Sequence, residues 1–83
     1  MESVKLSKDL YVPIDNIKYY VAYNSNFVKR NVREQKKNGN TYDVCCGKKI
    51  MTVIYLKTGD VILSPININT INNRIINGGA NNY

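Results

Sequence analysis

The second half of the chain has the clearest hydrophobic pattern. The stretch "IMTVIYL" at 50–56 is apolar and rich in β-branched residues with few polar interruptions, which is typical of a well-buried strand. The polar "KTGD" at 57–60 predicts a tight turn, and "VILS" at 61–64 predicts the strand that returns from it. These three stretches therefore predict a strand–turn–strand unit.

The first half predicts two more strands. "DLYVPI" at 9–14 is expected to form a short strand in which Pro13 marks an edge or an irregularity. "NIKYYVAY" at 16–23 follows as a second strand whose alternate side chains face opposite sides. One face is expected to hold Ile17, Tyr19, Val21 and Tyr23, and the other Lys18, Tyr20 and Ala22.

A charged segment without strand alternation comes next, and it predicts a helix over about 27–38. Val28 and Val32 are four residues apart and so lie on one helical face. A neighbouring face is basic, which leaves it free for solvent or for an acidic partner. The basic residues on that face are Lys29, Arg33, Lys36 and Lys37.

Both ends of this helix have candidate capping residues. Ser25 or Asn26 is placed to accept a hydrogen bond from the first helical turn. Gly39 is placed to end the helix in the left-handed conformation. The "NG" at 38–39 is also compatible with a hairpin turn, but the charged stretch before it favours the helix.

Two adjacent cysteines precede a predicted bend. "YDVCC" at 42–46 is compatible with a strand, and Gly47 can take a positive φ at low cost. Lys48 and Lys49 are then expected to project from the start of the next strand. If the stretch is extended, Cys45 and Cys46 point to opposite faces, one buried and one more exposed.

The C-terminal segment predicts a short helix and a tail. After Pro65, Asn67 or Asn69 is a candidate cap for the helix. The isoleucines that recur at helical spacing are Ile68, Ile71, Ile75 and Ile76. The full pattern predicts an α+β fold, a small single domain over 1–83. It has a mostly antiparallel sheet, one central helix, a short C-terminal helix and flexible ends at about 1–9 and 77–83.

Charge narrows the possible partners. The chain has 83 residues and a net charge of +6, and seven of its twelve basic residues lie between Lys29 and Lys49. Such a cluster favours phosphate-bearing partners, although a solvated helix face explains it equally well. No apolar run long enough for a membrane helix or a signal peptide is present, so we expect a cytoplasmic protein without a membrane partner.

The residue types argue against an enzyme. The chain has no histidine, so zinc sites that need histidine and Cys–His catalytic pairs are excluded. The "CCGKKI" at 45–50 lacks the earlier glycine and the Ser or Thr of a phosphate-binding loop. The carboxylates are scattered, although separated carboxylates can meet in space. We therefore expect structural cysteines, no metal, no cofactor and no small-molecule substrate.

Most of the chain, from about Tyr11 to Ile75, resembles the small bacterial extracellular matrix regulatory proteins, the RemA/RemB group. Their landmarks occur here in the same order, and the spacing across the segment carries the resemblance. The landmarks are "KR" at 29–30, Glu34, Lys36–Lys37, Asp43, the glycine and two basic residues at 47–49, Val53–Ile54, "VILS" at 61–64, Thr70 and Arg74.

The resemblance implies a DNA-binding transcriptional regulator of biofilm matrix genes that forms ring-like homo-oligomers larger than a dimer. The family's paired arginines after the turn glycine match Lys48 and Lys49, and a further arginine falls at Met51. The arginine of the early strand aligns with Asn16, with Lys18 two residues on. Lysine lacks the bidentate fork of arginine, so double-stranded DNA is expected to be held through its backbone with weak sequence specificity.

Other basic residues and another function class remain open. If the turn does not hold DNA, the contact surface is expected on the helix, at Lys29, Arg30 and Arg33. The alternative function is a small protein-binding adaptor or inhibitor from a phage or mobile element, with tyrosines as anchors. The tyrosines available for that role are Tyr19, Tyr20, Tyr23 and Tyr42.

Overall fold

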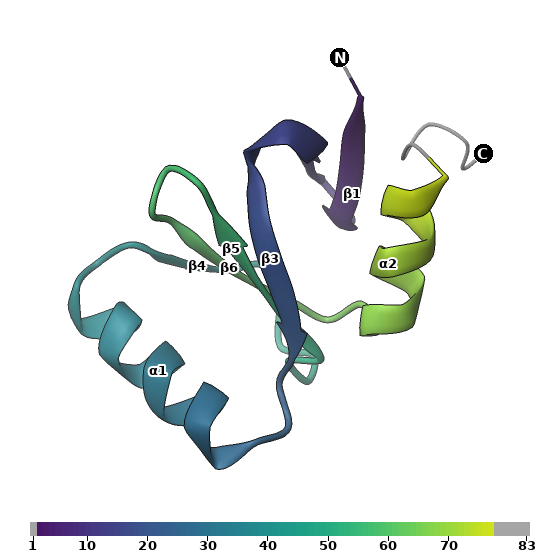
Figure 1. Cartoon of the computed structure of the whole chain (residues 1–83). Coiled ribbons are helices and arrows are strands. Elements are labelled where there is room, and N and C mark those ends of the chain that lie inside the picture. Colours follow the sequence, from purple (N-terminus) through teal and green to yellow (C-terminus); the bar gives the residue numbers. More distant parts are fainter. Residues whose placement is uncertain (1, 78–83) are drawn as a thin grey trace.

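The computed structural model describes residues 2–77 and has the expected α+β fold, with two α-helices and six strands in that range (Figure 1). The elements in chain order are β1 (Ser3–Ser7), β2 (Leu10–Pro13), the 3-10 turn η1 (Ile14–Asn16), β3 (Ile17–Ala22), α1 (Asn26–Lys37), β4 (Thr41–Asp43), β5 (Thr52–Leu56), β6 (Val61–Ser64) and α2 (Ile68–Ile76). Neither helix is long and apolar enough to cross a membrane within these residues.

Four strands form the main sheet in the order β3-β5-β6-β4, and β1 pairs with β2 in a separate hairpin. The sheet is antiparallel except where β4 runs parallel to β6, so the expectation of a mostly antiparallel sheet is confirmed. Helix α1 packs on one face of the sheet, while α2 and the β1–β2 hairpin lie on the other face (Figure 1). The sheet is therefore the middle of three layers.

This arrangement explains the nearly uninterrupted apolar runs of β5 and β6. Ile54 and Ile62 face the hairpin and α2, while Val53 and Leu63 face α1. Because both faces of β5 and β6 are covered, consecutive residues are apolar whichever face their side chains point to. Each of these four side chains is buried, as the pattern over 50–64 predicts.

Helix α1 begins and ends where its sequence predicts. The Ser25 hydroxyl oxygen accepts the Val28 N–H at 3.2 Å, which satisfies one donor of the first turn. Gly39 has a φ of +77°, the left-handed conformation that ends the helix. Val32 is buried against the sheet, with Val28 half-buried beside it.

The N-terminal end differs from its prediction. A flexible segment was expected over about 1–9, but Ser3–Ser7 forms β1, and Val4 and Leu6 are fully buried. Helix α2 holds this strand in place, because Arg74 Nη1 donates to the Lys5 carbonyl at 2.8 Å. At the other end, Asn77 caps α2, and the rest of the expected flexible tail, 78–83, lies outside the described residues.

The predicted faces of β3 are only partly right. The pairing with β5 shifts by one position between Ile17 and Tyr19, so the alternation restarts there. As a result Ile17 packs with Tyr20 on the hairpin side, whereas Val21 packs on the α1 side. A register irregularity of this kind depends on the partner strand and leaves no signal in the β3 sequence itself.

Candidate nucleic-acid interface

The segment after β4 is a tight turn. The Lys48 N–H donates to the Cys45 carbonyl at 3.0 Å, and both residues between them have positive φ, +54° at Cys46 and +86° at Gly47. Two positive φ values define a type I′ turn, which is unusual for a cysteine. The bend at Gly47 is confirmed, but β4 ends at Asp43, so the cysteines belong to the turn and not to a strand.

The two cysteines have different surroundings, as expected. Cys45 is 3% exposed, and its Sγ donates to the Leu63 carbonyl at 3.4 Å. Burial, with a smaller effect from the neighbouring Asp43 carboxylate, raises the pKa of the Cys45 thiol to about 11. Cys45 is therefore a protonated core residue at neutral pH, while Cys46 is exposed.

The Cys45 pKa predicts how stability changes at high pH. The folded pKa of about 11 lies above the ordinary value of 9.0, so the contribution is complete below pH 9 and is lost as the pH rises toward 11. The full loss in unfolding free energy, reached above pH 11, is about 2–3 kcal/mol, and about 2 kcal/mol of it is expected by pH 10.5. Urea unfolding at pH 8 and pH 10.5 measures it. Cys45→Ala should show a smaller loss between these pH values, and Cys46→Ala the same loss as the parent chain.

Lys48 closes this turn, and Lys49 follows it in the loop before β5. Both side chains are exposed, and β5 begins only at Thr52, so they project from a loop and not from the strand itself. Within residues 2–77, neither lysine side chain forms a hydrogen bond or an ion pair. Their ammonium groups are therefore available to a negatively charged partner.

Further lysines gather at the same end of the sheet. The Tyr23 N–H donates to the Met51 carbonyl at 3.0 Å, which ties the loop before α1 to the loop that carries Lys49. Lys29 Nζ lies 5.8 Å from the centre of the Tyr23 ring, so the first turns of α1 add a positive charge here. We call the surface formed by Lys29, Lys48, Lys49 and Lys8 the lysine end.

Lys8 was missed by the sequence interpretation. It lies in the β1–β2 turn and lines one hollow together with Cys46 and Lys48. Nothing near Lys8 in the sequence links it to the 48–49 loop, because the contact depends on how the hairpin packs on the sheet. Because residues of about 1–9 were expected to be flexible, Lys8 was not considered as a binding residue.

The remaining predicted residues lie elsewhere. Asn16 and Lys18 are at the opposite end of β3, beside the 57–60 turn, where the Lys57 N–H donates to the Asn16 carbonyl at 2.7 Å. Four strand steps separate Lys18 from Ala22, or about 13 Å. One protomer therefore does not bring Asn16 and Lys18 together with Lys48 and Lys49.

The other predicted helix residues are solvent-facing. Arg30 and Arg33 are exposed on α1, on the side away from the sheet. The family landmark Arg74 is different, because its guanidinium holds the β1 backbone. Of the basic landmark positions, Arg74 is structural, whereas Lys48 and Lys49 are exposed, as are the landmark lysines and arginine of α1.

The four tyrosines that were candidate anchors, all among the described residues, do not form one patch. Tyr19 and Tyr42 are exposed, but they lie on β3 and β4, the two opposite edges of the main sheet. The Tyr20 hydroxyl donates to Asn72 Oδ1, and the Tyr23 ring lies beneath Lys29. The aromatic anchors that an adaptor needs are thus spread over different surfaces.

Comparison with known proteins finds a matching family and related proteins. The model of the RemA-like family, described as extracellular matrix regulatory protein A-like, matches residues 4–75. A "Putative regulatory protein" of Synechococcus elongatus is 34% identical over 67 residues, covering 81% of this chain and 77% of that protein. Another of the same description, from Lachnoclostridium phytofermentans, is 40% identical over 48 residues, 58% of this chain and 53% of that protein.

The family description and the names of these relatives support a regulatory role. The family model spans β1 to α2, so it includes both layers that cover the sheet as well as the lysine-bearing turn. The chain belongs to the RemA-like family of extracellular matrix regulatory proteins.

Proposed function

We propose that this protein is a DNA-binding transcriptional regulator of matrix genes that holds duplex DNA through the lysine end. The observation that carries the proposal is the exposed pair Lys48–Lys49 on a tight turn, with no partner for either ammonium group within the described residues. Lys29 and Lys8 enlarge the same positive surface. Phosphate groups are the natural counterions for such a surface.

The contact is expected to read the DNA backbone more than its bases. Lysine places a point charge near a phosphate but cannot form the paired hydrogen bonds that arginine makes to guanine. Arg30 and Arg33 share α1 with Lys29, and both are exposed on the outer side of that helix. Affinity should therefore depend strongly on salt and only weakly on sequence.

The salt dependence gives a direct test. If Lys48 and Lys49 each neutralise one phosphate, they contribute about 1.8 per protomer to the slope of log K against log[salt]. A mobility shift with one duplex at 50 and 200 mM salt measures the total slope. A slope near zero would remove electrostatic phosphate binding from the mechanism, and a strong preference among duplexes of equal length would contradict backbone recognition.

We also propose that the protein is a homo-oligomer larger than a dimer. An apolar groove of about 270 Å³ lies between β2 and β4, and both strands have an unpaired edge within the described residues. Tyr42 lines it and is 55% exposed. A groove of this kind is typical of a surface that a second chain covers.

A second copy of this chain suits the charge of the groove. Asp60 lines the groove and Asp43 is exposed on β4, in a chain whose net charge is +6. The positive surfaces of another copy are complementary to this rim. Because a groove that receives a different surface of its neighbour makes a head-to-tail contact, the assembly can close into a ring.

Assembly also accounts for the separated basic groups. Lys18 lies four strand steps, or about 13 Å, from Ala22 at the other end of β3, and Lys57 is hydrogen-bonded to Asn16 beside it, so in one protomer both are too far to contact the same phosphate as Lys48 and Lys49. Neighbouring protomers can supply the two groups to one DNA path. Several weak contacts then act together at high effective concentration.

A further inference from the structure

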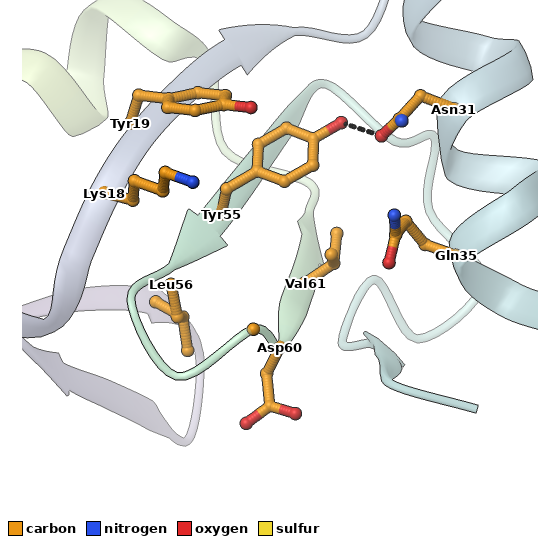
Figure 2. Close-up of a pocket in the computed structure, with 9 residues that line it drawn as sticks. Lys18, Tyr19, Asn31, Gln35, Tyr55, Leu56, Asp60 and Val61 are labelled. Carbon is orange, nitrogen blue, oxygen red and sulfur yellow. Dashed lines mark hydrogen bonds between the residues drawn. The ribbon is translucent and has the colours of Figure 1, made fainter. Parts of the chain in front are cut away.

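A second site candidate lies on the α1 side of the sheet, away from the lysine end (Figure 2). It is a pocket of about 210 Å³ between α1 and the ends of β3 and β5. Its side chains combine two aromatic rings, two amides and one ammonium group. These side chains belong to Lys18, Tyr19, Asn31, Gln35 and Tyr55.

The two amides present their nitrogens as donors. The Tyr55 hydroxyl donates to Asn31 Oδ1 at 2.6 Å, and Asn40 Nδ2 donates to Gln35 Oε1 at 2.9 Å. Both amide oxygens are therefore occupied, and the nitrogens of Asn31 and Gln35 remain as the donors. The two residues are four apart on α1 and so lie on one face, and Figure 2 shows the Gln35 nitrogen turned toward Asn31.

The hydroxyl that fixes Asn31 keeps its proton. Burial, and to a smaller extent the neighbouring Tyr19, raises the pKa of Tyr55 above its ordinary value of 10.0. The phenol thus stays neutral through the physiological range and continues to donate to Asn31. The Asp60 carboxylate lines the rim but points away from the amides, so it does not compete for them (Figure 2).

The other side chains of the pocket can bind a ligand that has a planar ring and a negative charge. The rings of Tyr19 and Tyr55 lie 4.8 Å apart between centres with a tilt of 40°, and Tyr19 is half-exposed. A planar ring can stack on the open face of this pair. Lys18 is exposed at the mouth, 5.9 Å from the centre of the Tyr19 ring, where its ammonium group can meet a phosphate.

Two neighbouring amide donors require two neighbouring acceptors on the ligand. Among the nucleic-acid bases, guanine presents such an edge, with acceptors at both O6 and N7. Adenine has a donor, its 6-amino group, in place of O6, and this group would face an amide donor. The pocket volume is below the roughly 300–1,000 Å³ of drug-sized sites, so it holds a base and leaves the sugar and phosphate at the mouth.

We propose that this pocket binds a guanine mononucleotide, with O6 and N7 accepting from Asn31 and Gln35, the base stacked on the tyrosine pair and the phosphate at Lys18. The site is separate from the lysine end, so the proposal does not rest on DNA binding. A nucleotide bound here would be a small-molecule ligand of the regulator. It would lie at the opposite end of the sheet from the 48–49 loop.

Calorimetric titration of the full chain with GMP, AMP, guanosine and inorganic phosphate tests the proposal. GMP should bind about tenfold more tightly than AMP, since the donor–acceptor pattern is reversed at position 6 of the base. Guanosine should bind more weakly than GMP, and inorganic phosphate weaker still. Equal affinity for GMP, AMP and phosphate would show general attraction to a basic protein and overturn the proposal, as would no binding of GMP.

Gln35→Glu is the decisive variant. A carboxylate oxygen still accepts from Asn40, so the local structure is kept, but the donor is replaced by an acceptor with negative charge. GMP binding should fall by tenfold or more, with circular dichroism unchanged. Unchanged GMP affinity in Gln35→Glu would contradict the proposed contact.

Lysine variants separate this site from the lysine end. Lys18→Ala should weaken GMP binding more than Lys57→Ala, which removes an equal charge from the neighbouring turn. Lys48→Ala with Lys49→Ala should lose DNA and bind GMP as before. If both ligands are lost together in that double variant, GMP occupies the lysine end, and the pocket assignment is wrong.

Discussion

Lys48→Ala with Lys49→Ala is expected to abolish detectable duplex binding while the fold remains intact. Both side chains are exposed and form no hydrogen bond or ion pair within residues 2–77 that folding would lose. Each lysine removed takes away one phosphate contact per protomer, and an oligomer repeats the loss in every subunit. The effect should therefore far exceed that of one ordinary pair of surface charges.

The matched control is Lys36→Ala with Lys37→Ala. This variant also removes two exposed charges, but from the last turn of α1, at the helix end away from the lysine end. Lys57→Ala provides a single-charge comparison near Asn16 and should cost less than the 48–49 pair. Mobility shifts at two salt concentrations, with light scattering to confirm unchanged mass, give the comparison.

Two results with the 48–49 and 36–37 double variants would contradict the proposed DNA contact. Equal losses from the 48–49 and 36–37 pairs would show that the whole positive surface attracts DNA and that no defined contact exists. Full binding by the 48–49 variant would exclude this loop, and the contact surface would then be sought on α1, at Lys29, Arg30 and Arg33.

Local sequence signals were sufficient for much of the fold. The apolar run of β5, the 57–60 turn and β6 were predictable because neighbouring residues alone define them, and Gly59 takes the positive φ that such a turn needs. Helix α1 was predictable for the same reason, since its cap and its left-handed end lie within the segment itself. Gly47 belongs to this group as well.

Distant contacts account for the features that were missed. Strand β1 has only two buried apolar side chains, and α2, some 65 residues further along the chain, completes its surroundings. The parallel pairing of β4 with β6 and the β3 irregularity also depend on partners far along the chain. The same holds for the candidate interface. The folded chain brings Lys8 next to Lys48 and puts Lys18 at the opposite end of the sheet from Lys49, and neither relation can be read from the sequence.

The pocket beside α1 was invisible in the sequence for a related reason. Asn31 and Gln35 are ordinary polar helix residues in one dimension, and a solvated face is the usual explanation for them. Their significance depends on Tyr55 and Asn40, which occupy the amide oxygens from other elements. A donor pattern is a property of the hydrogen-bond network and not of the residue types.

Tyr42→Asp is expected to break the homo-oligomer and with it most duplex affinity. Tyr42 lines the apolar groove beside β4, and a carboxylate there adds a third negative charge to Asp43 and Asp60. Burying that charge against a second protomer is costly, while the exposed position makes the change tolerable in the folded monomer.

The expected result is a lower mass by sedimentation and a loss of duplex affinity of at least about 100-fold, although every DNA-contacting lysine is unchanged. Ile76→Asp is the control, since it gives the same carboxylate in place of an exposed apolar side chain on α2, away from the groove. That variant should keep both mass and affinity.

A parent chain that sediments as a monomer at micromolar concentration would contradict assembly itself. A smaller Tyr42→Asp species that still binds DNA as tightly as the parent would show that the lysine end acts alone and that avidity plays no part.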